Sequence, residues 1–111
     1  MNAIKILEAW NSSIKNKSEY PLGHLLHKDC KIEYFGRPKI QSKEEHLIWC
    51  RDNTTAKCIG DFHVIYDKNG VCCGNHGLAY SSGKFGLIMF FGQCSDTGVT
   101  SYNSLVSRDR D

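Results

Sequence analysis

Apolar residues near the N-terminus recur every three or four positions, and they form one stripe made by Ile4, Leu7, Trp10 and Ile14. This spacing predicts an amphipathic helix over residues 3–15. Pro21 suits the first turn of a second, short helix, because its missing N–H would be unpaired there anyway. We expect that second helix to end near residues 28–29.

A short strand and a third helix are expected next. Residues 31–35 are β-prone, and Ser42 and Glu45 then have the spacing of a capping box. In such a box the serine hydroxyl accepts a hydrogen bond from the N–H of Glu45, and the glutamate carboxylate accepts one from the N–H of Ser42. The box predicts a helix that begins here and ends at about residue 52.

The second half of the chain has a different pattern, with four β-prone segments at residues 58–66, 71–80, 85–93 and 99–107. The segments between them are short and contain glycine with Asn, Asp or Ser, which is typical of tight hairpin turns. Short turns exclude the long crossovers that parallel strands need, so the four strands are predicted to form an antiparallel meander.

The strand around residues 87–91 is apolar at both parities, which predicts cover on both faces. One layer of helices covers only one face of a sheet. We therefore expect a second copy of the chain to cover the other face in a homodimer. The alternative is that glycines on this strand let a neighbouring loop pack over it.

Length and charge restrict the class of protein. A chain of 111 residues has the size of a single domain over residues 1–111. The formal charge of +2 and the scattered Lys and Arg residues argue against a nucleic-acid partner. The longest apolar run has five residues, far short of the ~20 that span a bilayer. Lys5 and Glu8 interrupt the N-terminus, so no signal peptide is expected and the interpretation is a cytoplasmic protein without a membrane partner.

The six cysteines are interpreted as free thiols, because disulfides are rare in a reducing compartment. No Cys-x-x-Cys pair is present. His24 and His27 share a helical face but lack a third ligand, so no metal site is expected. With His46, they are interpreted as solvated helix residues. No cofactor is expected.

The run Leu25–Tyr34, the segment Lys43–Trp49, the turn at residues 67–70 and the last strand together resemble the nuclear transport factor 2-like superfamily. The likeness is to its SnoaL-like, polyketide-cyclase-like branch. This resemblance implies a cystatin-like α+β fold, in which a curved antiparallel sheet forms a cone around N-terminal helices and a mostly apolar pocket. Members include isomerases, dehydratases, cyclases, hydrolases and non-catalytic binding domains, so the fold does not choose among them.

Acid/base chemistry in such a pocket requires a carboxylate or histidine set in apolar walls. Asp61 and His63 lie two apart on one strand and so share a face. His76 on the next strand joins His63 if Asn69-Gly70 forms the turn, and it joins Asp61 if Lys68-Asn69 does. A bulged turn that pairs Asp67 with Val71 puts His76 on the opposite face from both.

Other side chains are candidates for the pocket wall. Tyr34 could supply a hydroxyl for catalysis, and Trp10, Trp49, Met89 and Tyr102 could contact a ligand. Ordinary core packing is the competing interpretation, and it is favoured for the two tryptophans because both lie on apolar helical stripes.

The steroid-isomerase type of member relies on a tyrosine in the first helix and a carboxylate on a late strand. This chain has Trp10 in that helix and no carboxylate in residues 85–93, which argues against that chemistry. The interpretation is a small-molecule-binding domain, with an acid/base isomerase, dehydratase or cyclase reaction on a small apolar metabolite as one reading. The alternative is a non-catalytic binding or dimerisation module. The sequence does not decide whether the chain is an enzyme.

Overall fold

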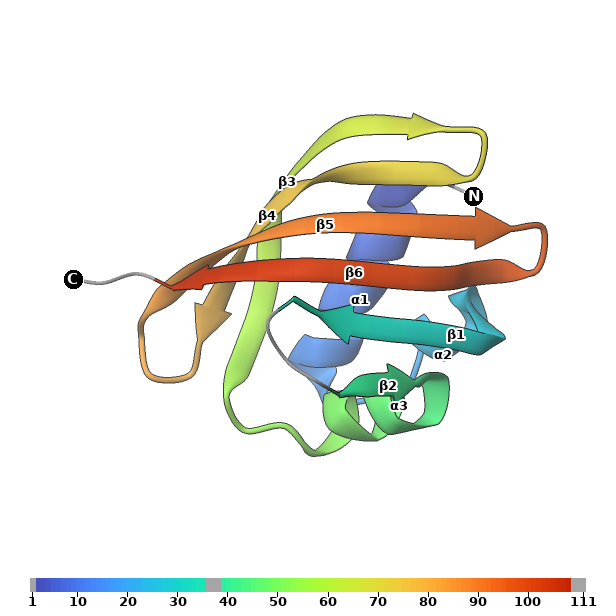
Figure 1. Cartoon of the computed structure of the whole chain (residues 1–111). Coiled ribbons are helices and arrows are strands. Elements are labelled where there is room, and N and C mark those ends of the chain that lie inside the picture. Colours follow the sequence, from blue (N-terminus) through green and yellow to red (C-terminus); the bar gives the residue numbers. More distant parts are fainter. Residues whose placement is uncertain (1, 36–38, 109–111) are drawn as a thin grey trace.

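The computed structural model describes residues 2–35 and 39–108. One long helix crosses the inner face of a curved six-stranded sheet, and shorter helices lie beside its lower edge (Figure 1). The elements are α1 (Ala3–Asn16), α2 (Leu22–Leu25), β1 (Leu26–Tyr34), β2 (Ile40–Ser42), α3 (Lys43–Asp52), β3 (Ala56–Lys68), β4 (Val71–Tyr80), β5 (Phe85–Ser95) and β6 (Gly98–Arg108). The strand order is β2-β1-β6-β5-β4-β3. The predicted α+β class with a curved sheet on N-terminal helices is confirmed.

Helix α1 is confirmed with nearly the predicted bounds. Asn2 caps it by accepting a hydrogen bond from the N–H of Lys5 at 2.9 Å. The Asp67 carboxylate at the end of β3 accepts from the N–H of Ala3 at 2.9 Å, which joins the start of the helix to the far end of the sheet. The buried face differs from the predicted stripe, since Ile4 is exposed and Ile6 is buried.

The segment after α1 is more extended than predicted. Helix α2 ends at Leu25, and strand β1 already begins at Leu26. This strand pairs in parallel with β6, with Leu26 opposite Val99 and Ile32 opposite Tyr102. Pairing with β6 therefore overrides the local helical pattern of the leucines. Strand β2, which pairs with β1, was not predicted.

The capping box of α3 is confirmed. The Ser42 hydroxyl accepts from the N–H of Glu45 at 3.2 Å, and the Glu45 carboxylate accepts from the N–H of Ser42 at 3.1 Å. The antiparallel meander of β3, β4, β5 and β6 is also confirmed, with every strand as long as predicted or longer.

The β3–β4 hairpin has the first of the three registers considered, but only near its turn. Asn69 and Gly70 both have positive φ values, 55° and 76°, and Lys68 pairs with Val71. Further along β3, the register shifts between Val64 and Tyr66. That bulge changes which residues of the two strands meet.

As a result, His63 pairs with Asn75 rather than with His76. A second shift lies between Gly60 and His63, where Asp61 has a φ of 53°. Bulges bend a strand and increase its twist, and three register shifts along β3 accompany the curvature of the sheet (Figure 1).

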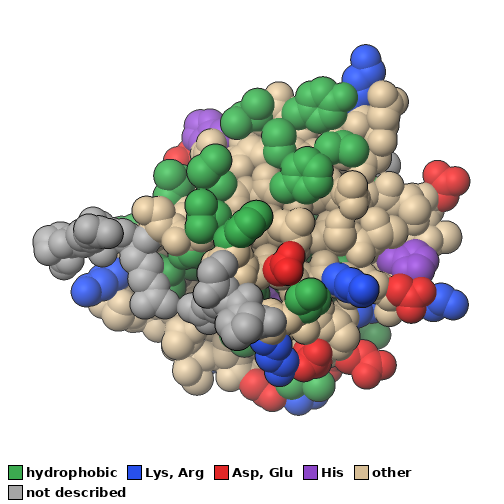
Figure 2. All heavy atoms as spheres, viewed as in Figure 1, with side chains coloured by type: hydrophobic (Ala, Val, Ile, Leu, Met, Phe, Trp, Pro, Cys, Tyr) green, Lys and Arg blue, Asp and Glu red, His purple; other side chains and the backbone are tan. Residues whose placement is uncertain are grey.

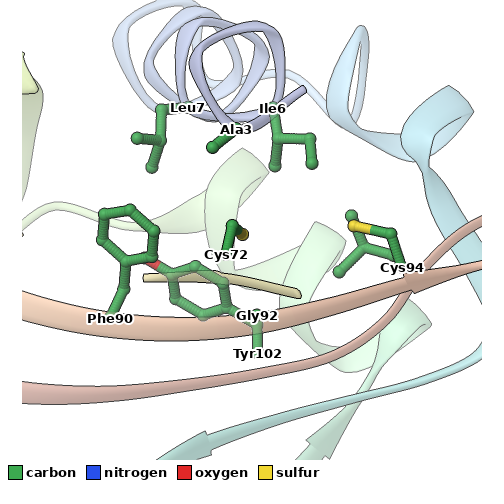
Figure 3. Close-up of a pocket in the computed structure, with 9 residues that line it drawn as sticks. Ala3, Ile6, Leu7, Cys72, Phe90, Gly92, Cys94 and Tyr102 are labelled. Carbon is green, nitrogen blue, oxygen red and sulfur yellow. The ribbon is translucent and has the colours of Figure 1, made fainter. Parts of the chain in front are cut away.

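The core between the start of α1 and the sheet is closely packed. Ala3, Ile6 and Leu7 of α1 point toward Cys72, Cys94 and the rings of Phe90 and Tyr102 (Figure 3). The space left there is about 10 Å³, room for about one water molecule. Cys72 and its neighbour Cys73 lie on opposite faces of β4 as predicted, and burial raises the pKa of Cys72 to about 11.

Candidate active site

A cavity of about 1080 Å³ opens at the other end of the molecule, beside the second half of α1. Its walls come from α1, α3, the inner faces of β3 to β6, the β4–β5 turn and the segment that leads into β2. The volume is slightly above the usual range of about 300–1,000 Å³ for small-molecule sites. Thirteen of the 22 described lining residues are apolar or aromatic, and the other nine, with the tyrosine hydroxyls, supply polar groups.

Two of these polar groups, His76 of β4 and Tyr102 of β6, lie close together. Both side chains are buried, and the His76 Nε2 atom is 3.4 Å from the Tyr102 hydroxyl oxygen. Neighbouring rings restrict both side chains, because Phe90 lies between the two strands and packs against His76 and Tyr102 at centroid distances of 5.9 and 6.0 Å.

The hydrogen bonds assign the proton of His76. Its Nδ1 atom is 2.9 Å from the carbonyl oxygen of Gly77, which can only accept, so Nδ1 carries the proton. Burial lowers the pKa of His76, against a smaller opposing effect of the Gly77 carbonyl. The neutral imidazole therefore directs the Nε2 lone pair toward Tyr102. Burial also raises the pKa of Tyr102, so its hydroxyl stays protonated and donates.

Ser104 adds a third polar group to the same wall. It lies two residues after Tyr102 on β6 and is buried. Its hydroxyl oxygen has no hydrogen-bond partner among the described residues. A buried polar atom without a partner is costly and uncommon. The cavity beside Ser104 is the place from which a ligand would supply that partner.

His46 of α3 corrects the sequence interpretation, since it is not solvated but fully buried. Its Nε2 atom accepts from the indole N–H of Trp10 at 2.9 Å, and its Nδ1 atom is 2.9 Å from the side-chain oxygen of Gln41. The ring also stacks on Trp49 at 5.4 Å. Burial lowers the pKa of His46 to about 4. His46 thus joins three residues that line the cavity without lining it itself.

Asp61 and His63 do not reach the cavity. Their side chains are 85% and 63% exposed on the outer face of β3, where they form an ion pair of 3.2 Å with each other. Their predicted role as base and partner required the inner face. The bulge between Val64 and Tyr66 gives the physical reason, because it separates His63 from His76.

Of the other predicted site residues, four line the cavity and one does not. Trp10, Trp49, Tyr34 and Tyr102 line the cavity. Met89 does not, because it is on the outer face of β5 and 57% exposed. Strand alternation accounts for this, since Ile88 and Phe90 on either side of Met89 point inward.

The residues that sequence analysis missed include Ser104 in the cavity wall and His46 behind it. Ser104 shares the parity of Tyr102 and Val106, so the alternation along β6 contained a signal for it. His46 lies four residues before Cys50 and next to Leu47, which is the helical spacing of a buried face. The charged residues around it hid that pattern.

Within residues 2–35 and 39–108, no group of three His, Cys, Asp or Glu side chains lies close enough to hold a metal ion. No helix in this part of the chain is long and apolar enough to cross a membrane.

No family model matches the sequence. No curated protein matches it either. Solved structures do match its fold. A protein from Kribbella flavida, provisionally assigned as a ketosteroid isomerase, superposes with a TM-score of 0.78 at 8% identity, over 96% of this chain and 78% of that one. An NTF2-like protein of unknown function from Burkholderia xenovorans gives 0.74 at 10% identity, over 97% and 84%. A protein from Sphaerobacter thermophilus gives 0.72 at 12% identity, over 100% and 99%.

Proposed function

Since the chain has the nuclear transport factor 2-like fold, we propose that it binds a small, mostly apolar carbonyl compound in its cavity and catalyses a proton transfer on it. The observation that carries this proposal is the contact of His76 Nε2 with the Tyr102 hydroxyl, 3.4 Å apart in the cavity wall. An isomerase reaction fits best, because a base and a hydrogen-bond donor are the two groups that it requires.

In the proposed reaction, substrate binding turns the Tyr102 hydroxyl away from His76, so that its one O–H donates to the substrate carbonyl oxygen and the Nε2 lone pair is free. His76 Nε2 removes a proton from the carbon next to that carbonyl, and the electron pair of the C–H bond moves toward the oxygen as an enolate. The Gly77 carbonyl, 2.9 Å from Nδ1, stabilises the imidazolium that results. The proton then returns from Nε2 to another carbon of the conjugated system, which moves the double bond.

Ser104 strengthens the oxygen site in this proposal. Its unpartnered hydroxyl lies on the same strand face as Tyr102 and can donate a second hydrogen bond to the enolate oxygen. Two donors aimed at a developing oxyanion are a common source of rate enhancement. The cavity lining contains no Asp or Glu among the described residues, which favours His76 as the base.

Proton exchange in D2O tests the proposal without knowledge of the substrate. The protein is incubated with a panel of small cyclic and aryl ketones, and loss of the α-proton signals is followed by proton NMR. We expect catalysed exchange that H76Q abolishes and that Y102F lowers by about 10²-fold. The matched control is H63Q, whose imidazole lies on the outer face. Exchange that H76Q leaves unchanged would contradict the assignment.

The partner proposed for the outer face of the sheet is a second copy of the chain. Hydrophobic side chains gather over this face (Figure 2), and the exposed ones on β5 and β6 include Leu87, Met89, Phe91 and Leu105. Large exposed apolar patches are unusual on monomers. Sedimentation equilibrium is expected to give a dimer, and M89K is expected to give a monomer with unchanged secondary structure. A wild-type monomer at 100 μM would contradict this partner.

A further inference from the structure

We propose that the ligand of the cavity is an aryl or other apolar carboxylic acid, bound as the anion with its carboxylate at the mouth beside Lys84. The inference rests on the proposed function only in taking this cavity as the ligand site. It concerns the end of the ligand that lies away from His76 and Tyr102.

The first argument is the orientation of the Gln41 amide. The indole of Trp10 can only donate, so His46 Nε2 must accept from it and Nδ1 must carry the ring proton. Nδ1 therefore donates to Gln41, and the amide oxygen is the group that accepts. No hydrogen bond in the described part of the chain engages the amide NH2 group of Gln41. Because Gln41 lines the cavity, it offers a ligand donors rather than an acceptor.

The second argument is the charge of the lining. Lys39 and Lys84 line the cavity, and no described Asp or Glu does. Lys39 is compensated, because its ammonium lies 3.0 Å from the Glu45 carboxylate. Lys84, in the turn between β4 and β5, forms no ion pair with any described residue. Among the described lining residues, Lys84 is therefore the one uncompensated cation, and it favours an acceptor-rich anion beside it.

The third argument is the apolar part of the cavity wall. It is formed by aromatic and aliphatic side chains, among them Trp10, Trp49, Ile88 and Val106. Such a wall favours an apolar or aromatic body. An apolar body with one anionic end matches apolar side chains of this kind with a lysine at the rim.

The test uses two probes of the same shape, 4-phenylbutyrate and its neutral amide, 4-phenylbutanamide. The chain has two tryptophans, and both line the cavity. Their indole N–H signals in a 1H–15N spectrum therefore report binding in the cavity and do not respond to binding on the outer face of the sheet. We expect the acid to shift both signals and to bind at least fivefold more tightly than the amide.

Substitution of Lys84 locates the anion. K84M is expected to weaken binding of the acid about fivefold, as for an exposed ion pair, and to leave binding of the amide unchanged. The matched control is K68M, since Lys68 is exposed on β3 and lies outside the cavity lining. Its affinity for both probes should equal that of the wild type.

Three results would overturn the inference: equal affinity for acid and amide, no effect of K84M on the acid, or no shift of either indole signal with the acid. The proposed function fails on a different result, namely proton exchange into neutral ketones that H76Q leaves unchanged. If the cavity binds the amide as tightly as the acid, recognition of a carboxylate is ruled out. The proposed role of His76 as the base is not affected by that result.

Discussion

The two faces of the β3–β6 sheet hold histidines in opposite situations. On the inner face, His76 is buried, neutral and in contact with Tyr102 beside the cavity. On the outer face, His63 is mostly exposed and forms an ion pair with Asp61. The sequence favours Asp61 and His63 as candidates and makes the role of His76 depend on the register of the hairpin. Strand alternation and one bulge in β3 decide which of them the cavity can use.

The apolar residues of β5 show a weaker contrast. Phe90 is buried against Tyr102 and His76, and Phe91 is exposed next to Met89 on the other face. An outer face this apolar is characteristic of a surface that another surface covers. The inner face is covered by α1 and lines the cavity, whereas the outer face of β5 leaves large apolar side chains exposed.

The largest difference between the two faces is expected when Phe90 and Phe91 are each replaced by alanine. Phe90 is 4% exposed and Phe91 is 43% exposed. F90A should lower the free energy of unfolding by about 3–5 kcal/mol, because it leaves a cavity in the core. F91A should lower it by less than about 1 kcal/mol. Urea unfolding at a protein concentration that keeps the chain monomeric measures both, and equal losses would contradict the assignment of the faces.

Because the buried histidines resist protonation, low pH should lower the free energy of unfolding. Unfolded His46 binds a proton near pH 6.5, but folded His46 binds one only near pH 4. Between these values the unfolded state binds more protons, so the free energy of unfolding falls as the pH falls, by about 3 kcal/mol in full. His76 contributes in the same direction, because its pKa is also lowered by burial.

The comparison of wild type with H46Q isolates this effect from that of the carboxylates. Urea unfolding at pH 7 and pH 4.5 should show that the wild type loses about 2–3 kcal/mol more than H46Q over this range. H63Q is the control from the outer face and should behave as the wild type. Equal losses in wild type and H46Q would show that His46 is not held neutral in the core.

Two glycines of β4 differ in the space that the neighbouring strand leaves for a side chain. A Cβ at Gly74, on the inner face, would lie within 3.0 Å of the Val64 Cα atom and closer still to the His63 carbonyl oxygen. At Gly77, on the other face, the nearest atom would be the Gly60 oxygen at 3.5 Å. G74A should destabilise the fold by about 1–3 kcal/mol and G77A by less than about 1 kcal/mol. Thermal unfolding measures both, and a harmless G74A would argue against the bulge beside it.

The smallest effect is expected for the ion pair on the outer face. Replacing Asp61 and His63 by Asn and Gln should change the free energy of unfolding by less than about 0.5 kcal/mol, since both side chains are exposed. Proton exchange should also be unchanged. A loss of exchange in this double variant would show that the outer face takes part in catalysis.

Much of the fold could be predicted because its signals are local. The extent of α1, the Ser42–Glu45 capping box and the glycine-containing turns each depend on a few neighbouring residues, and the structure confirms all three. The start of β1 could not be predicted, because Leu26 becomes strand through pairing with Val99, more than 70 residues away. Long-range pairing of this kind leaves no trace in local periodicity.

The site was less predictable than the fold for a related reason. The turn at Asn69 and Gly70 could be predicted from the sequence, but the bulge between Val64 and Tyr66 could not. That bulge places His63 opposite Asn75 instead of His76. His46 was missed because its burial depends on Trp10 and Gln41, which come from other elements. Which side chains meet in the cavity depends on pairing and bulges across the whole sheet, and local sequence does not contain that information.

The most direct test of the central claim is a long-range 1H–15N spectrum of the histidine rings near pH 6.5, with His76 assigned by comparison with H76Q. The structure predicts a neutral His76 ring that carries its proton on Nδ1, with Nε2 unprotonated toward Tyr102. An imidazolium, or a neutral ring with the proton on Nε2, would contradict the claim that the cavity contains a histidine base.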